Sequence, residues 1–73
     1  LRLNPRRDAL EACLEKLDPP SRRLVDSIYV EGKGVAAVAG EQGLAAQTIY
    51  NKLGFIRRAL ARCVERRLAE GSA

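Results

Sequence analysis

Four polar side chains in the second half of the chain have the types and the spacing to bind a nucleic acid. Gln47 and Asn51 are one helical turn apart, and Arg58 and Arg62 repeat that spacing farther along. At about 100° per residue, all four would share one side of a helix. Amides bind adenine through two hydrogen bonds, and arginines bind phosphates. The pattern predicts a helix whose first turns meet base edges and whose later turns meet the DNA backbone.

Neighbouring residues complete this candidate contact surface. Alanines at the start of the helix allow close approach to DNA, while Thr48, Tyr50 and Lys52 flank the face, within reach of sugar or phosphate. The candidate DNA-binding residues are Ala46, Gln47, Thr48, Tyr50, Asn51, Lys52, Arg58 and Arg62. The alternative is that the polar members form an ordinary solvated face. That alternative is favoured for Arg66 and Arg67, because cations in a last helical turn stabilise the helix dipole.

Two further residues on this segment do not fit an ordinary helix. Phe55 lies on the side expected to face water, where it is suited to meet DNA sugar, another domain or a partner protein. Gly54 costs about 1 kcal/mol relative to alanine within a helix, and its missing side chain permits a close approach.

The distribution of charge supports a polyanion as the partner. The chain has 13 basic and 9 acidic residues, a formal charge of +4. The excess lies between residues 43 and 67, where Glu65 is the one acid among six bases. Local excess of this kind is typical of a nucleic-acid-binding face. A membrane-surface helix is less favoured, because the apolar side of this segment is needed for a core.

Hydrophobic periodicity predicts four helices and no strands. Asn4-Pro5 and Asp18-Pro19 are capping residues followed by proline at the first helical position. We expect helices at about 5–17, 19–30, 35–41 and 45–68. The expected inward-facing residues are Leu10, Cys13, Leu14, Leu17, Leu24, Val25, Ile28, Tyr29, Val35, Val38, Ala39, Ile49, Leu53, Ile56, Leu60, Val64 and Leu68. Tyr29 is expected in the core with its hydroxyl at the surface. The 73 residues therefore form one all-α, four-helix domain.

The third and fourth helices have the spacing of a helix-turn-helix unit. Ala39 is small enough for two helices to cross closely, and Gly43 can adopt the left-handed conformation of a tight turn. Val38, Leu44 and Ile49 are expected to form the small core between the helices. The fourth helix would then be the recognition helix, which enters the major groove.

The two cysteines and the absence of histidine limit other chemistry. Cys13 and Cys63 are fifty positions apart, so a zinc site is disfavoured, and we expect both to be buried, reduced core residues. No paired carboxylates or phosphate-binding glycine loop occur, so the chain is not expected to be an enzyme, and no cofactor or metal is expected. No apolar run approaches the roughly 20 residues of a membrane span. No signal peptide is visible, and the start at Leu1 suggests a fragment of a longer protein.

Three segments together resemble a known family. "LEKLDPPSRRLV", "YVEGKGVAAVAGEQG" and "TIYNKLGFIRRAL" are similar to the fourth conserved region of bacterial sigma factors, most closely the extracytoplasmic-function class. The resemblance covers residues 9–68. It is carried by a leucine-proline-arginine helix followed by a Tyr-x-x-Gly turn, and it implies a four-helix domain without a wing at the C-terminal end of a longer cytoplasmic protein.

The resemblance also implies a function and partners. Members of this family bind the minus-thirty-five promoter element and dock on the beta-subunit flap of the RNA polymerase core, and many are captured by an anti-sigma factor. The family's DNA contacts correspond here to Ala46, Gln47, Tyr50 and Asn51, with Lys52 beside them. The sequence departs from the family at five positions: Ala37, Gln42, Ala45, Tyr50 and Phe55.

Two other functions remain open on the sequence. The chain is also consistent with a DNA-binding output domain of another transcription regulator. A third hypothesis is a sigma-like protein-interaction module that no longer binds DNA, and the aromatic residues Tyr50 and Phe55 motivate it, because basic residues are frequent at those positions in the family.

Overall fold

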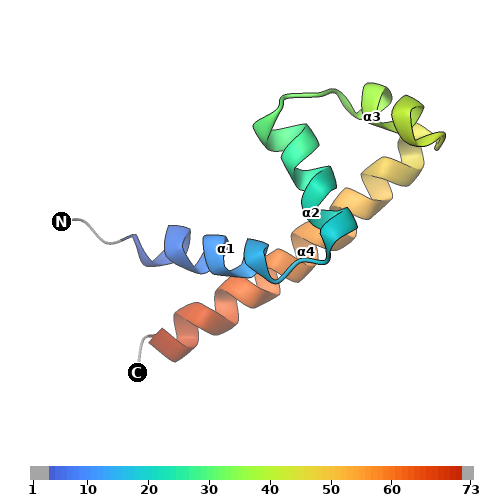
Figure 1. Ribbon diagram of the computed structural model, residues 1–73. Helices are drawn as coiled ribbons and strands as arrows, with labels where there is room; N and C mark the ends of the chain where they lie inside the picture. Colours follow the sequence, from blue (N-terminus) through green and yellow to red (C-terminus); the bar gives the residue numbers. More distant parts are fainter. Residues whose placement is uncertain (1–3, 72–73) are drawn as a thin grey trace.

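The computed structural model describes residues 4–71, and every regular element in that range is helical (Figure 1). The elements are α1 (Pro5–Glu15), α2 (Pro19–Val25), a π-helical segment η1 (Asp26–Val30), α3 (Val35–Gln42) and α4 (Ala46–Gly71). The all-α, four-helix fold is confirmed. Figure 1 shows α4 as a long diagonal rod, with α1 against its C-terminal half and α2 and α3 beside its N-terminal half.

The first two helices begin at the capping residues that the sequence predicts. The Asn4 side chain accepts a hydrogen bond from the Arg7 backbone N–H at 3.1 Å. Asp18 accepts from the Ser21 backbone N–H at 3.1 Å and from its hydroxyl at 2.8 Å. These hydrogen bonds, the side-chain one foremost, hold the pKa of the Asp18 carboxyl below its ordinary value. Helix α1 ends at Glu15, two residues before the predicted end.

The second predicted helix is not α-helical throughout. From Asp26 to Val30 the backbone is π-helical, and the Glu31 N–H donates to the Asp26 carbonyl at 2.8 Å. A π-helix has more residues per turn than an α-helix, so the 3.6-residue period fails across this segment. Leu24 and Val25 are buried as expected, but Tyr29 is 55% exposed. The prediction that Tyr29 lies in the core is therefore wrong.

One apolar cluster joins the last three α-helices. Its buried members are Leu24, Val25, Val38, Ala39, Ile49, Leu53 and Ile56, and Leu14, Leu17, Ile28, Val35 and Leu60 pack against it partly buried. Ile49 is completely buried at the point where α3 and α4 meet. This cluster fixes the orientation of α4 relative to α3, which positions the candidate binding face.

Helix α1 is joined to α4 by a disulfide bond between Cys13 and Cys63, whose Cα atoms are 6.0 Å apart. The prediction of two reduced cysteines is therefore wrong. Their spacing of fifty residues gave no sign of a pair, because only the packing of α1 on α4 brings them together. Cys13 is buried as predicted, whereas Cys63 is only half-buried.

The C-terminal part of α4 extends past the core. Val64 and Leu68 continue the predicted apolar stripe but are only half-buried, because few other elements reach this end. The molecule is accordingly elongated, with extents of 45 × 24 × 16 Å. Among the described residues, no helix combines the length and the apolar character that crossing a membrane requires.

Candidate nucleic-acid interface

The turn between α3 and α4 contains the left-handed glycine that the helix-turn-helix pattern predicts. Gly43 adopts a left-handed conformation with φ of 68°. Its backbone N–H donates hydrogen bonds to the carbonyl groups of Ala39 and Gly40 in α3. The Leu44 N–H donates to the Ala39 carbonyl at 2.9 Å. Ala39 and Val38 are buried between the helices. Leu44 is 38% exposed, so the prediction that it belongs to this small core is wrong.

Helix α4 begins at Ala46, one residue later than predicted, without a side-chain cap from the residue before it. The Ala45 carbonyl accepts hydrogen bonds from the N–H groups of Thr48 and Ile49. Alanine has no side-chain acceptor, so it cannot bond the free N–H groups of this first turn. The start of α4 therefore exposes the small side chains of Ala45 and Ala46, which allow a close approach to this end of the helix.

The two amides of the candidate face are bonded to each other. Nε2 of Gln47 donates a hydrogen bond to Oδ1 of Asn51 at 3.0 Å, and both side chains are exposed. The bond orients the Asn51 amide, leaving its N–H₂ group free to donate. A carbonyl oxygen has two lone pairs, so Oδ1 can still accept a second hydrogen bond.

A cation–π contact lies one to two turns farther along α4. The Arg58 guanidinium carbon is 5.0 Å from the centroid of the Phe55 ring. Phe55 is 69% exposed and Tyr50 is 58% exposed, so both aromatic side chains lie on the surface. The predicted outward position of Phe55 is confirmed, and the contact gives it a partner that the sequence alone did not suggest.

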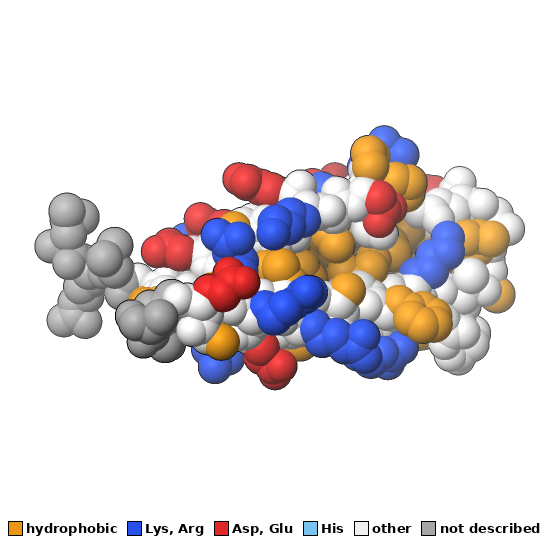
Figure 2. Space-filling view, turned by 90° about the horizontal axis from the view of Figure 1, so that it is seen from below, with side chains coloured by type: hydrophobic (Ala, Val, Ile, Leu, Met, Phe, Trp, Pro, Cys, Tyr) orange, Lys and Arg blue, Asp and Glu red, His pale blue; other side chains and the backbone are white. Residues whose placement is uncertain are grey.

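The arginines of the outer face, Arg58 and Arg62, have no ion-pair partner among the residues that the structure describes. Within residues 4–71, the ion pairs join Arg7 to Glu11, Arg22 to Asp26, and Lys33 to Glu31 and Glu41, all outside α4. Arg58 and Arg62 are exposed, and neither forms an ion pair with a described carboxylate. Figure 2 shows a band of Lys and Arg side chains along the middle and right of one face, whereas Asp and Glu gather mostly toward the left.

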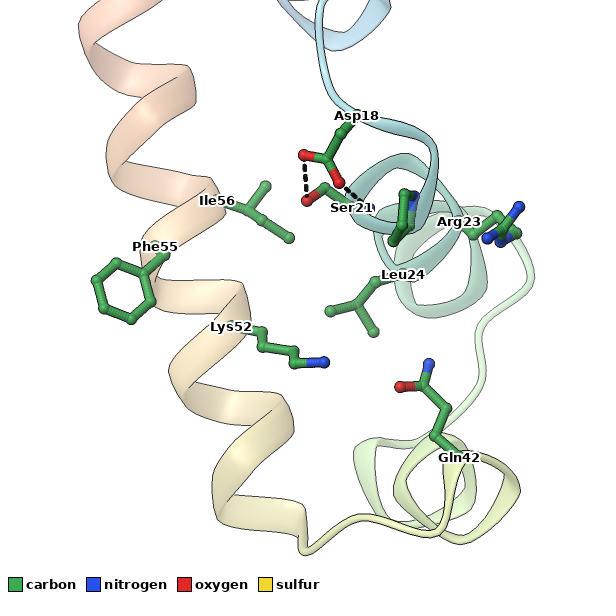
Figure 3. Close-up of a pocket in the computed structure, with 9 residues that line it drawn as sticks. Asp18, Ser21, Arg23, Leu24, Gln42, Lys52, Phe55 and Ile56 are labelled. Carbon is green, nitrogen blue, oxygen red and sulfur yellow. Dashed lines mark hydrogen bonds between the residues drawn. The ribbon is translucent and has the colours of Figure 1, made fainter.

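Two of the predicted DNA-binding residues, Lys52 and Thr48, are set apart from the Gln47–Asn51 amide pair. Lys52 points toward α2 and lines a cavity of about 590 Å³ together with Leu24 and Phe55, although the Phe55 ring itself is directed away from α2 (Figure 3). Thr48 is half-buried. The structure thus brings Ala46, Gln47, Tyr50, Asn51, Arg58 and Arg62 onto one exposed surface of α4 and separates Lys52 from it.

Arg57 makes a contact that the sequence reasoning missed. Its Nε donates to the Tyr29 hydroxyl at 2.9 Å, Nη2 donates to the same oxygen, and the guanidinium lies 5.8 Å from the ring centroid. These contacts join α4 to the π-helical segment and engage one arginine in a structural role. No sequence signal identified it, because the exposure of Tyr29 depends on the π-helical turn.

A metal site requires several ligating side chains close together. Across residues 4–71, no three His, Cys, Asp or Glu side chains cluster in a way that could hold a metal ion.

Comparison of the chain with protein-family models, with curated proteins and with solved structures found no match.

Proposed function

We propose that this chain is a sequence-specific DNA-binding domain of transcription initiation, similar to the fourth region of a sigma factor. In this proposal α3 and α4 form the helix-turn-helix unit, and the first turns of α4 enter the major groove. Gln47 and Asn51 contact base edges, while Arg58 and Arg62 contact phosphates. Tyr50 contacts base or sugar between them.

The observation that carries the proposal is the coincidence of three features on α4. The Gly43 turn presents the start of the helix at one end of the molecule. The exposed amide pair lies in the first two turns. Residues 43–64 contain no acid, and the outward arginines have no ion-pair partner among the described residues. A helix needed only for its core would not require the last two features.

The direct test is binding of a labelled DNA duplex at several salt concentrations. Phosphate contacts release counterions, so the logarithm of the affinity should fall linearly with the logarithm of the salt concentration. Selection from randomised duplexes should then return a preferred site. Binding without salt dependence, or without any preferred site, would contradict the proposal.

The family resemblance supplies the proposed partners. In a sigma factor the domain acts in the cytoplasm on promoter DNA, docks on the beta-subunit flap of the polymerase core, and is a target for an anti-sigma factor. Binding to the polymerase core distinguishes this role from that of an output domain in another transcription regulator, which would bind DNA without it.

A protein-interaction module is the second candidate, and one surface feature favours it. An apolar hollow of about 280 Å³ lies between α1, α2 and α4, lined mainly by Leu10, Leu14, Val25, Leu53 and Leu60. The exposed Tyr29 ring and Arg57 stand at its edge. Retention of a protein partner by a variant that has lost DNA binding would support this second function.

A further inference from the structure

A shallow depression on the outer face of α4 is centred on a glycine, Gly54, which has no side chain to fill it. It measures about 340 Å³ and is lined by Tyr50, Asn51, Gly54, Phe55 and Arg58. Gly54 forms the floor because residues 50 and 51 precede it by one turn and residue 58 follows it by one turn. The walls are two exposed aromatic rings, and an amide and a guanidinium stand at the two ends along the helix.

The guanidinium at one end is held in place. Arg58 bends back over Gly54 and lies on the Phe55 ring, 5.0 Å from its centroid. Its two terminal nitrogens would lie 3.6 and 3.8 Å from a methyl group at position 54, so the guanidinium lies beside the glycine. An arginine fixed in this way loses less side-chain entropy when it binds an anion than a freely moving arginine does.

The same contact limits stacking in the depression. Arg58 occupies one face of the Phe55 ring, so an unstacked base cannot lie on that face. The depression offers a cation, an amide donor and two aromatic rings. Those groups suit a compact unit with an anionic end and a C–H-rich body.

The position of the depression along the helix identifies that unit. Gly54 lies seven residues beyond Gln47, or about 10 Å along the helix axis. The major groove is about 8.5 Å deep, so a helix that reaches base edges at Gln47 meets the sugar-phosphate strand near Gly54. We propose that the depression seats one deoxyribose-phosphate unit of duplex DNA, with Phe55 as the residue that positions Arg58. This inference rests on the proposed function and specifies how its backbone contacts are made.

Charge supports the same occupant. None of the five lining residues is acidic. The nearest acids in sequence are Glu41 in α3 and Glu65 in α4, and Asp18 lines the neighbouring cavity that shares Phe55. Glu41 is paired with Lys33 at 3.2 Å. An anionic phosphate therefore meets no opposing carboxylate within the depression.

Filling the floor gives the sharpest test. Gly54→Ala places a methyl group in the depression at ordinary contact distance from Arg58, and it favours the helix. Thermal unfolding of the 73-residue chain should therefore occur at a higher temperature, while affinity for a labelled mixed-sequence duplex should fall about two- to fivefold. Gly40→Ala is the matched control, since that α3 glycine has open space around it and lies outside the depression. It should raise stability without this loss of affinity.

The positioning role of Phe55 needs its own variants. Phe55→Leu removes the cation–π contact and should weaken duplex binding about two- to fivefold. Phe55→Tyr keeps the ring and should restore wild-type affinity. In an Arg58→Gln background, Phe55→Leu should have no further effect, because the residue it positions is gone. Arg58→Gln alone should reduce the salt slope by about 0.9.

The outcomes separate this inference from the proposed function. If the wild-type chain binds duplex DNA with a steep salt slope, but Gly54→Ala and Phe55→Leu bind equally well, the seat for deoxyribose-phosphate is refuted and the DNA-binding function stands. If the wild-type chain binds no duplex, both fail together. If Phe55→Leu weakens binding equally with and without Arg58, Phe55 contacts the DNA itself and its positioning role is refuted.

Discussion

Nε2 of Gln47 donates to Oδ1 of Asn51 at 3.0 Å, so the two amides proposed to contact bases form one hydrogen-bonded unit. An i,i+4 amide pair of this kind stabilises a helix only slightly, by about 0.2–0.5 kcal/mol. Its larger effect is on the orientation of the Asn51 amide, because the hydrogen bond turns Oδ1 toward Gln47 and the N–H₂ group away from it. The proposed base contacts of the two residues are therefore coupled.

The coupling predicts the behaviour of amide variants. Asn51→Ala should relax sequence preference at one or two base pairs, with a loss of about 1–3 kcal/mol in discrimination. Gln47→Ala should change preference at an adjacent position and also weaken that of Asn51. Selections from randomised duplexes with each variant and with the double variant measure this. Strictly additive effects would show that the hydrogen bond has no role in base recognition.

Arg58 and Arg62 should contribute to affinity without contributing to sequence preference. Replacing both by Gln should lower the salt slope by about 1.8, at 0.9 for each lost phosphate contact. The reduction should be the same for all sequences, because every nucleotide carries the same phosphate. Arg66 and Arg67, both replaced by Gln, form the control with equal charge change near the end of α4. An equal effect of the two double variants would indicate general attraction rather than contacts.

Two glycines three residues apart should respond oppositely to the same substitution. Gly43 has φ of 68°, whereas Gly40 is helical, and a Cβ at either position meets nothing within 4 Å. Gly43→Ala should lower the free energy of unfolding by about 1–2 kcal/mol through backbone strain alone. Gly40→Ala should raise it by up to about 1 kcal/mol. Urea unfolding followed by circular dichroism measures both, and a neutral Gly43→Ala would show that the turn can change conformation.

The disulfide should be a large contribution to stability. It closes a loop across a sequence separation of 50 residues, for which the chain-entropy model predicts about 4 kcal/mol. Reduction with dithiothreitol should lower the urea midpoint accordingly. The variant with both Cys13 and Cys63 replaced by Ala should resemble the reduced chain and be insensitive to the reductant. If reduction leaves the wild-type midpoint unchanged, α1 is held by apolar packing alone.

The Asp18 cap should make stability depend on acid pH. Its hydrogen bonds to Ser21 lower its pKa in the folded chain, so its contribution is complete above the ordinary carboxyl pKa and is lost as pH falls through the lowered value. Asp18→Asn keeps a capping acceptor that does not titrate. Between neutral and acid pH, the free energy of unfolding should therefore fall less in this variant than in the wild-type chain. Equal pH profiles would contradict the capping contribution.

The sequence alone predicted those features that depend on residues close together in the chain. The caps at Asn4 and Asp18 depend on hydrogen bonds three residues apart, and the Gly43 turn depends on one backbone conformation. The apolar period of α4 predicted the burial of Ile49, Leu53 and Ile56. The same period placed the amides and arginines on the outer face. The helical fold and most of the candidate surface could therefore be derived from the sequence alone.

Contacts between distant segments required the tertiary structure. The Cys13–Cys63 bond and the Arg57–Tyr29 contact join residues 50 and 28 positions apart, and no local spacing distinguishes such pairs from many others. The π-helical turn also had no sequence signature, and it moved Tyr29 from its expected place in the core to the surface. The direction of Lys52 was decided by the packing of α2 beside α4. Each outcome depends on how whole helices pack, because packing determines which exposed side chains meet.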